Sequence, residues 1–326
     1  GQPPAAADAG APGGGSGRAP QAPAAAPEPP PVSGGGRIPG GLSGVYAHTM
    51  SKVRAYEALR GSPVNVVLTF TERDSWQDIT NPWIGSSPEA LGSFNGTWVI
   101  SVPFYPKGQG DLGSCARGAY NGHWQQFGRW MVNKGRPASI VRLAWEFNGN
   151  WWYWSANNNP TDWVGCFRQV VSAIRSTNPQ ARIDWTMNAH NGNPWAVYPG
   201  DQYVDIIGID NYDMWPPNTT EAIFDQNCVR PNGLCSVIKF AREHGKQFSV
   251  PEWGLVGKSD TAAGRAGAAG GDNPVYIKKM YETLRANADV LAYECYFGDA
   301  LPGNVHSSLV NPNEHPNGAA TYAALW

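Results

Sequence analysis

Eight short apolar runs alternate with longer amphipathic stretches from Leu42 onward, and this alternation constrains the fold more than any other feature. The runs are rich in Val, Ile and aromatic residues, which favour β-strands. The predicted strands cover residues 42–48, 64–70, 96–104, 139–147, 181–188, 204–212, 247–253 and 289–297. The predicted helices cover residues 51–60, 87–94, 121–135, 161–176, 219–226, 235–244, 274–287 and 317–325.

Strands that alternate with helices predict a parallel sheet. Eight such strands after Leu42 predict closure into a (β/α)8 TIM barrel. The alternative is an open doubly wound sheet, which needs a Gly-rich phosphate loop after its first strand, and residues 46–52 offer none. Thr161 and Asp162 predict a helix N-terminus, whereas Gly135 and Gly245 stand where helices should end.

Residues 1–38 differ in composition from the rest, since they are almost entirely Pro, Ala and Gly with a few polar residues. Such a segment cannot bury enough apolar surface to offset its ordering entropy. We predict a disordered linker over 1–38, followed by a single barrel domain over 39–326. The linker either tethers this domain to a membrane, wall or other module, or has no role.

The five cysteines lack a CxxC pair, which argues against a zinc or thioredoxin-type site. Cys228 and Cys235 bracket a short loop that a disulfide would close, Cys115 and Cys166 are the other plausible pair, and Cys295 lies in an apolar run as a buried free thiol. Disulfides indicate an oxidising compartment, so we predict a secreted protein. No run of 18 apolar residues exists, so no membrane span is expected.

The formal net charge of −2 argues against nucleic acid or an anionic membrane surface as the main partner. We expect a monomer. The chain has 15 Trp, 13 Tyr and 10 Phe, and such side chains either fill the core or stack on the apolar faces of sugar rings.

In a (β/α)8 barrel the active site forms at the C-terminal ends of the strands. Two of the predicted strands end in glutamates, Glu146 on the fourth and Glu252 on the seventh, and these strands lie across the barrel mouth from each other. Glycosidic cleavage needs such a pair, because one carboxyl protonates the leaving oxygen while the other attacks the anomeric carbon. No His/Asp/Glu cluster has catalytic metal spacing, so we predict neither a metal nor an organic cofactor.

The segment VRLAWEFNGNWWYW (141–154) resembles the fourth-strand signature of glycoside hydrolase family 26, a family of retaining β-glycanases. WVISVPFYP (98–106), IGIDNYD (207–213) and VPEWG (250–254) extend the resemblance over most of residues 42–326. It implies that Glu146 is the acid/base and Glu252 the nucleophile. It also implies that Tyr212 hydrogen-bonds the nucleophile. Arg142 holds a carboxylate in place or forms a plain structural ion pair.

The sequence departs from the family at Trp145, since mannan-cleaving members usually carry His before the acid/base. β-1,4-Mannan therefore stays first only narrowly, ahead of mixed-linkage or β-1,4-glucan, with β-1,3-xylan also open. A polar partner for the axial hydroxyl of mannose could come from Asn148, Asn188 or His190. The candidates for sugar contact are Trp145, Trp151, Trp152, Trp154, His190, Trp195, Trp215 and Trp253.

Two rival functions remain open. One is a catalytically inactive barrel that binds polysaccharide through its aromatic residues. The other is a structural or adhesion protein anchored by residues 1–38, which predicts no cleft at the strand ends.

Overall fold

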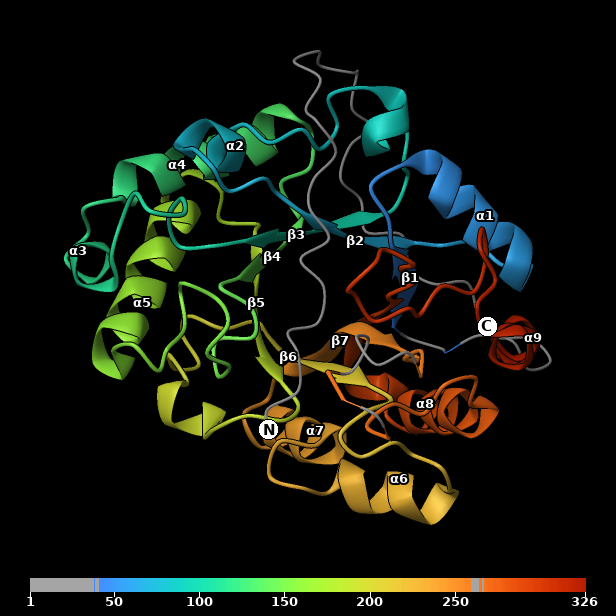
Figure 1. The fold of residues 1–326 in the computed structure, drawn as a ribbon. Helices are drawn as coiled ribbons and strands as arrows, with labels where there is room; N and C mark the ends of the chain where they lie inside the picture. The colour runs from blue at the N-terminus through green and yellow to red at the C-terminus, as the bar shows by residue number, and fades with distance from the viewer. Residues whose placement is uncertain (1–37, 39–40, 259–263, 266) are drawn as a thin grey trace.

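The computed structural model describes residue 38 and residues 41–258, 264–265 and 267–326. The predicted linker over 1–38 therefore lies almost wholly outside the described residues. The described chain forms a closed barrel of parallel strands in the order β1 to β8, with helices around it (Figure 1). The prediction of a (β/α)8 barrel is confirmed, and the open doubly wound sheet is excluded because β1 pairs with both β2 and β8.

All eight predicted strands form, most of them shorter than the apolar run that contains them. They are β1 (Leu42–Tyr46), β2 (Val66–Phe70), β3 (Thr97–Val102), β4 (Ile140–Leu143), β5 (Arg182–Asn188), β6 (Ile206–Tyr212), β7 (Gln247–Gly254) and β8 (Leu291–Tyr296). Nearly all their residues are buried, because side chains face either the barrel interior or the surrounding helices.

The main helices follow their predicted positions within a few residues. They are α1 (Met50–Arg60), α4 (Asn121–Asn133), α5 (Pro160–Thr177), α6 (Glu221–Cys228), α7 (Leu234–Glu243), α8 (Pro274–Ala286) and α9 (Pro316–Leu325). The sequence did not predict four short elements, α2 (Trp76–Thr80), α3 (Leu112–Ala116), η2 (Pro194–Val197) and η3 (Ala288–Val290).

Two predicted helix boundaries were wrong. The N-cap of α5 is Asn159, whose side chain accepts a hydrogen bond from the Asp162 amide, with Pro160 at the first helical position. The helix expected over 87–94 is only η1 (Pro88–Gly92), because Leu91 adopts a φ of 69° and interrupts it. By contrast, Gly135 and Gly245 have φ values of 70° and 63° just after α4 and α7, as helix-ending glycines should.

The disulfide predictions are confirmed. Cys228–Cys235 closes the loop between α6 and α7, and Cys115–Cys166 joins α3 to α5. Cys295 is buried and unbridged. Among the described residues, no helix is both long and apolar enough to cross a membrane.

A polar layer fills the barrel interior between β5, β6, β7 and β8. The buried carboxylate of Asp184 accepts hydrogen bonds from Thr186, Ser249 and Tyr293 at 2.5–2.7 Å. Gly208 faces this layer, and a Cβ there would lie within 2.6–2.7 Å of side-chain atoms of Ser249, Asp184 and Thr186. The absence of a side chain at Gly208 therefore gives the polar layer its room.

Candidate active site

The acid/base candidate Glu146 lies on a sharp turn directly after β4. Its φ is 52°, and that of Ala144 is 48°, so both residues adopt the left-handed conformation. The Glu146 amide donates to the carbonyl of Thr186, which ties the turn to β5. The turn brings the Glu146 side chain to the mouth side of the barrel, where the other strands end.

The carboxyl of Glu146 is buried and receives three hydrogen-bond donors. Asn188 Nδ2 donates to Oε2 at 3.0 Å, and the indole nitrogens of Trp152 and Trp151 approach Oε1 at 3.3 and 3.4 Å. Burial, and then the negative charge of Glu252, raises the pKa of Glu146 to about 7, while Asn188 and Arg142 oppose this shift. A carboxyl with this pKa can donate a proton near neutral pH.

The nucleophile candidate Glu252 is also buried, but it is held by different donors. Arg142 Nη2 donates to Oε2 at 2.6 Å, and the Tyr212 hydroxyl donates to Oε1 at 2.8 Å. A guanidinium on one oxygen and a phenol hydroxyl on the other hold this carboxyl group in a fixed orientation. The two glutamates thus have the unlike surroundings that unlike acid and nucleophile roles require.

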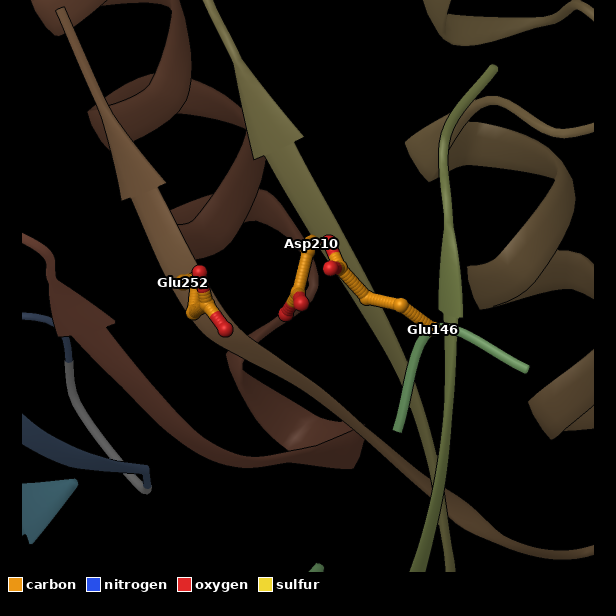
Figure 2. A group of neighbouring side chains, drawn as sticks. All are labelled: Glu146, Asp210 and Glu252. Atoms are coloured by element: carbon orange, nitrogen blue, oxygen red, sulfur yellow. The ribbon is translucent and has the colours of Figure 1, made fainter. Parts of the chain in front are cut away.

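Asp210 at the end of β6 is a third carboxylate in the site, and no sequence motif predicts a role for it. It forms an ion pair with Arg142, which therefore bridges Asp210 and Glu252. One oxygen from each of Glu146, Asp210 and Glu252 lies within 4.8 Å of the other two (Figure 2). Burial raises the pKa of Asp210 well above its usual range; Arg142 opposes this, and Glu252 and Glu146 add to it.

Three clustered carboxylates could hold a metal ion by geometry alone. However, the guanidinium of Arg142 already contacts Asp210 and Glu252 and supplies positive charge between them. The three carboxylates therefore form an ion-paired cluster around Arg142 rather than a typical metal site. One oxygen of Glu146 lies within 4.8 Å of one oxygen of Glu252. This is close to the carboxyl separation of about 5–5.5 Å in retaining glycosidases and shorter than the roughly 6.5–9.5 Å of inverting ones.

Asn148 supports the site through the backbone. Its Nδ2 donates to the carbonyl oxygens of Asn188 and Asn191, and its Oδ1 accepts from the Asn188 amide at 2.7 Å. Asn148 therefore fixes the strand end that presents Asn188 to Glu146. Because these contacts engage both ends of its amide, Asn148 is a supporting residue rather than a free partner for a sugar hydroxyl.

The structure divides the tryptophan candidates. Trp151 and Trp152 are half-buried beside Glu146, in the position expected for sugar contact. Trp145 and Trp154 are fully buried, packed on each other at 4.6 Å and, with Trp152, facing the guanidinium of Arg73. With no exposed ring face, Trp145 and Trp154 are walls of the site rather than stacking platforms.

Trp253 was wrongly assigned to sugar contact. It is fully buried on the far side of β7 from Glu252, where its indole nitrogen donates to Glu294 at 2.6 Å and its ring packs against Tyr296 and Trp326. Trp195 packs on Phe240 of α7 and donates to the carbonyl of Pro231, so it braces the loop after α6. His190 and Trp215 line a cavity that also reaches Tyr212.

A closed parallel barrel with two facing glutamates at the ends of β4 and β7 is the architecture of retaining TIM-barrel glycoside hydrolases. Residues 131–252, a stretch that holds Arg142, Glu146, Tyr212 and Glu252, match the model of glycosyl hydrolase family 26. The resemblance to family 26 that the strand-end motifs carried is confirmed by this match, which runs from the end of α4 through the nucleophile candidate on β7.

Two curated relatives match about half of the chain. A mannan endo-1,4-beta-mannosidase from Bifidobacterium adolescentis is 24% identical over 161 residues, which are 47% of this chain and 16% of that protein. Endoglucanase H from Acetivibrio thermocellus is 24% identical over 175 residues, 50% of this chain and 18% of that protein. The chain thus spans less than a fifth of the length of either relative.

Solved structures share the fold at low sequence identity. An endo-beta-1,4-mannanase from Cellulomonas fimi superposes with a TM-score of 0.62 at 17% identity, covering 87% of this chain and 70% of that chain. The catalytic domain of a Bacillus sp. JAMB-750 endo-beta-1,4-mannanase gives a TM-score of 0.59 at 17% identity, covering 86% and 85%. At these identities the likeness establishes the barrel fold alone.

Proposed function

We propose that the domain hydrolyses a β-linked polysaccharide at internal bonds with retention of configuration. The observation that carries this proposal is the pair Glu146 and Glu252, with oxygens within 4.8 Å of each other and unlike hydrogen-bond partners. Glu252 attacks the anomeric carbon while Glu146 transfers its proton to the leaving oxygen. In the second step Glu146 accepts a proton from water, whose oxygen bonds to the anomeric carbon and displaces the Glu252 carboxylate.

The electrostatics support this division of roles. Glu146, with a pKa near 7, holds a proton to give at neutral pH and accepts one in the second step. Arg142 donates to one oxygen of Glu252 and Tyr212 donates to the other, so the carboxylate is fixed in place for attack. A binding-only barrel has no use for this arrangement.

For the substrate, β-1,4-mannan comes first and β-glucan second. The curated relatives support both, since one is named a mannosidase and the other an endoglucanase. Trp145 in place of the usual His gives the wall beside Glu146 an apolar character, which favours glucan. The two disulfides fit an oxidising compartment, so we propose secretion, with residues 1–38 as a tether.

The test is product analysis on a panel of mannan, mixed-linkage glucan, β-1,4-glucan and β-1,3-xylan. New reducing ends with the β-anomer formed first indicate retaining endo-hydrolysis, whereas the α-anomer first would contradict the double displacement. The ratio of kcat/KM on mannan and glucan orders the substrates. A ratio that favours glucan by more than about tenfold, or roughly 1.4 kcal/mol, reverses the proposed order.

A further inference from the structure

A small, partly enclosed cavity lies between the ends of β5 and β6 and the loop closed by Cys228–Cys235, and it is lined by Tyr212 but by neither Glu146 nor Glu252. Its volume is about 30 Å³. Tyr212, which donates to Glu252, forms part of its wall, so one side chain connects the cavity with the nucleophile candidate. Since one water needs about 10–15 Å³ of such space, the cavity has room for about two water-sized groups.

The wall combines apolar and polar groups. Ala189, Met214, Phe224 and Leu234 supply apolar contact. His190 supplies a buried ring nitrogen, Nε2, that has no hydrogen-bond partner within the described residues. An unpaired buried polar atom is costly, so such an atom in a cavity wall beside an active site indicates a ligand group.

The protonation of His190 limits which ligand suits the cavity. Burial, and then the nearby charge of Arg230, lowers the pKa of His190 to about 4. The imidazole is therefore neutral at working pH and exchanges hydrogen bonds with neutral groups. A hydroxyl can both donate and accept, so it satisfies either tautomer.

The cavity is rigid because the disulfide loop is fastened to its surroundings. Asn232 Nδ2 donates to the carbonyl of Asn191 at 2.9 Å, and Trp195 donates to the carbonyl of Pro231 at 3.1 Å. On the other side, Asn227 donates to Asn218, which in turn donates to Asp213. A fixed wall keeps the size of the cavity constant, as size-based selection requires.

From this size, lining and position we infer that the cavity receives the exocyclic hydroxymethyl group of the attacked hexose, its methylene on the apolar wall and its hydroxyl on His190. The inference rests on the proposed function and extends it, because a pentose such as xylose lacks this group. The cavity then selects hexose polymers, mannan and glucan alike, over xylan. Filling one methylene-sized site and pairing one polar atom supports a preference of about 10- to 200-fold.

The experiment compares hexose oligosaccharides, manno- and gluco-, with xylo-oligosaccharides of the same length. Ala189→Leu fills the cavity, and His190→Leu removes the hydrogen-bonding nitrogen. Ala196→Leu is the matched control, because Ala196 is exposed on η2 outside the cavity wall. Melting temperatures identify any variant that fails to fold. If Ala189→Leu does not fold, His190→Leu still tests the cavity, because it adds little volume.

We expect the wild type to prefer hexose over xylose oligosaccharides at least tenfold in kcat/KM. Both cavity variants should lower that ratio about tenfold or more, whereas Ala196→Leu leaves it unchanged. An unchanged ratio in both cavity variants, or a wild type that prefers xylo-oligosaccharides or uronate-containing ones, overturns the inference.

A binding measurement separates this inference from the proposed hydrolysis. Titration calorimetry of Glu252→Ala with the same oligosaccharides reports the cavity without turnover. A wild type that cleaves none of them while the calorimetry still shows the hexose preference would overturn the proposed hydrolysis and keep the cavity assignment. Cleavage without any hexose preference would support the proposed hydrolysis and overturn the cavity assignment.

Discussion

The Tyr212 hydroxyl donates a hydrogen bond of 2.8 Å to Oε1 of Glu252. Loss of a hydrogen bond to a charged group costs about 1.5–3 kcal/mol. We therefore expect Tyr212→Phe to lower kcat about 10- to 100-fold on polysaccharide, with retention of configuration preserved. Tyr198→Phe is the control, since Tyr198 makes a similar hydrogen bond to Asp201 at the exposed surface. Equal losses in the two variants would show that the Tyr212 contact has no catalytic part.

The two glutamates should respond differently to truncation. Glu252→Ala removes the attacking oxygen and should abolish nearly all turnover on any substrate while leaving oligosaccharide binding intact. Glu146→Ala should lower kcat on polysaccharide about 10²- to 10⁴-fold, but the first step on an aryl glycoside with an acidic leaving group should persist, because that group departs without a proton. A pre-steady-state burst of the released phenol measures that step. A burst from Glu252→Ala and none from Glu146→Ala would show that Glu146 is the nucleophile and Glu252 the acid/base.

The pH profile should report Glu146. Its carboxyl must be protonated to donate, so activity should fall as the pH rises through the pKa of about 7. Asn188 donates to Oε2 of Glu146 and stabilises the carboxylate. Asn188→Ala should thus raise this pKa and move the alkaline limb of kcat/KM to higher pH. If the alkaline limb stays in place or moves to lower pH, the loss of activity at high pH does not arise from ionisation of Glu146.

The same raised pKa predicts a stability effect. Glu146 binds its proton more tightly in the folded state than in the unfolded state, where its pKa is near 4.5. Its favourable contribution is present below about pH 4.5 and is lost as the pH rises through about 7. Glu146→Gln should therefore stabilise the protein above pH 7, by roughly 3 kcal/mol, and have little effect near pH 4. Chemical denaturation of both proteins at pH 4 and pH 8 measures this, and an equal difference at both pH values would contradict it.

Strand positions could be predicted because every strand of a closed parallel barrel is an apolar run between polar segments. The short helices α2 and α3 could not be predicted, because five residues are too few to show the periodicity of a helix. Leu91 at a φ of 69° shows the opposite failure, since nothing in the local pattern predicts a left-handed leucine. The N-cap of α5 was misplaced because both Asn159 and Thr161 are good capping residues, and Pro160 decides between them.

The site was predicted in part for similar reasons. Trp253 follows Glu252 directly on β7, so strand alternation already places its side chain on the opposite face of the strand from Glu252. This alternation argues against sugar contact by Trp253, although the high number of tryptophans suggested it. Asp210 lies within the segment IGIDNYD (207–213), but nothing in the sequence assigns it a role. Its pairing with Arg142 depends on which side chains meet across the barrel, which one sequence does not show.

The turn that carries Glu146 has an evolutionary consequence. A non-glycine residue held at a φ of 52° stores roughly 1–3 kcal/mol of strain, and glycine at that position would not. Glu146→Gly would thus relax the backbone and remove a buried acid in one step, at the expense of the proposed chemistry. Selection for robustness alone would discard this glutamate, so a copy of the gene released from the demand for hydrolysis should lose residue 146 early and keep its barrel.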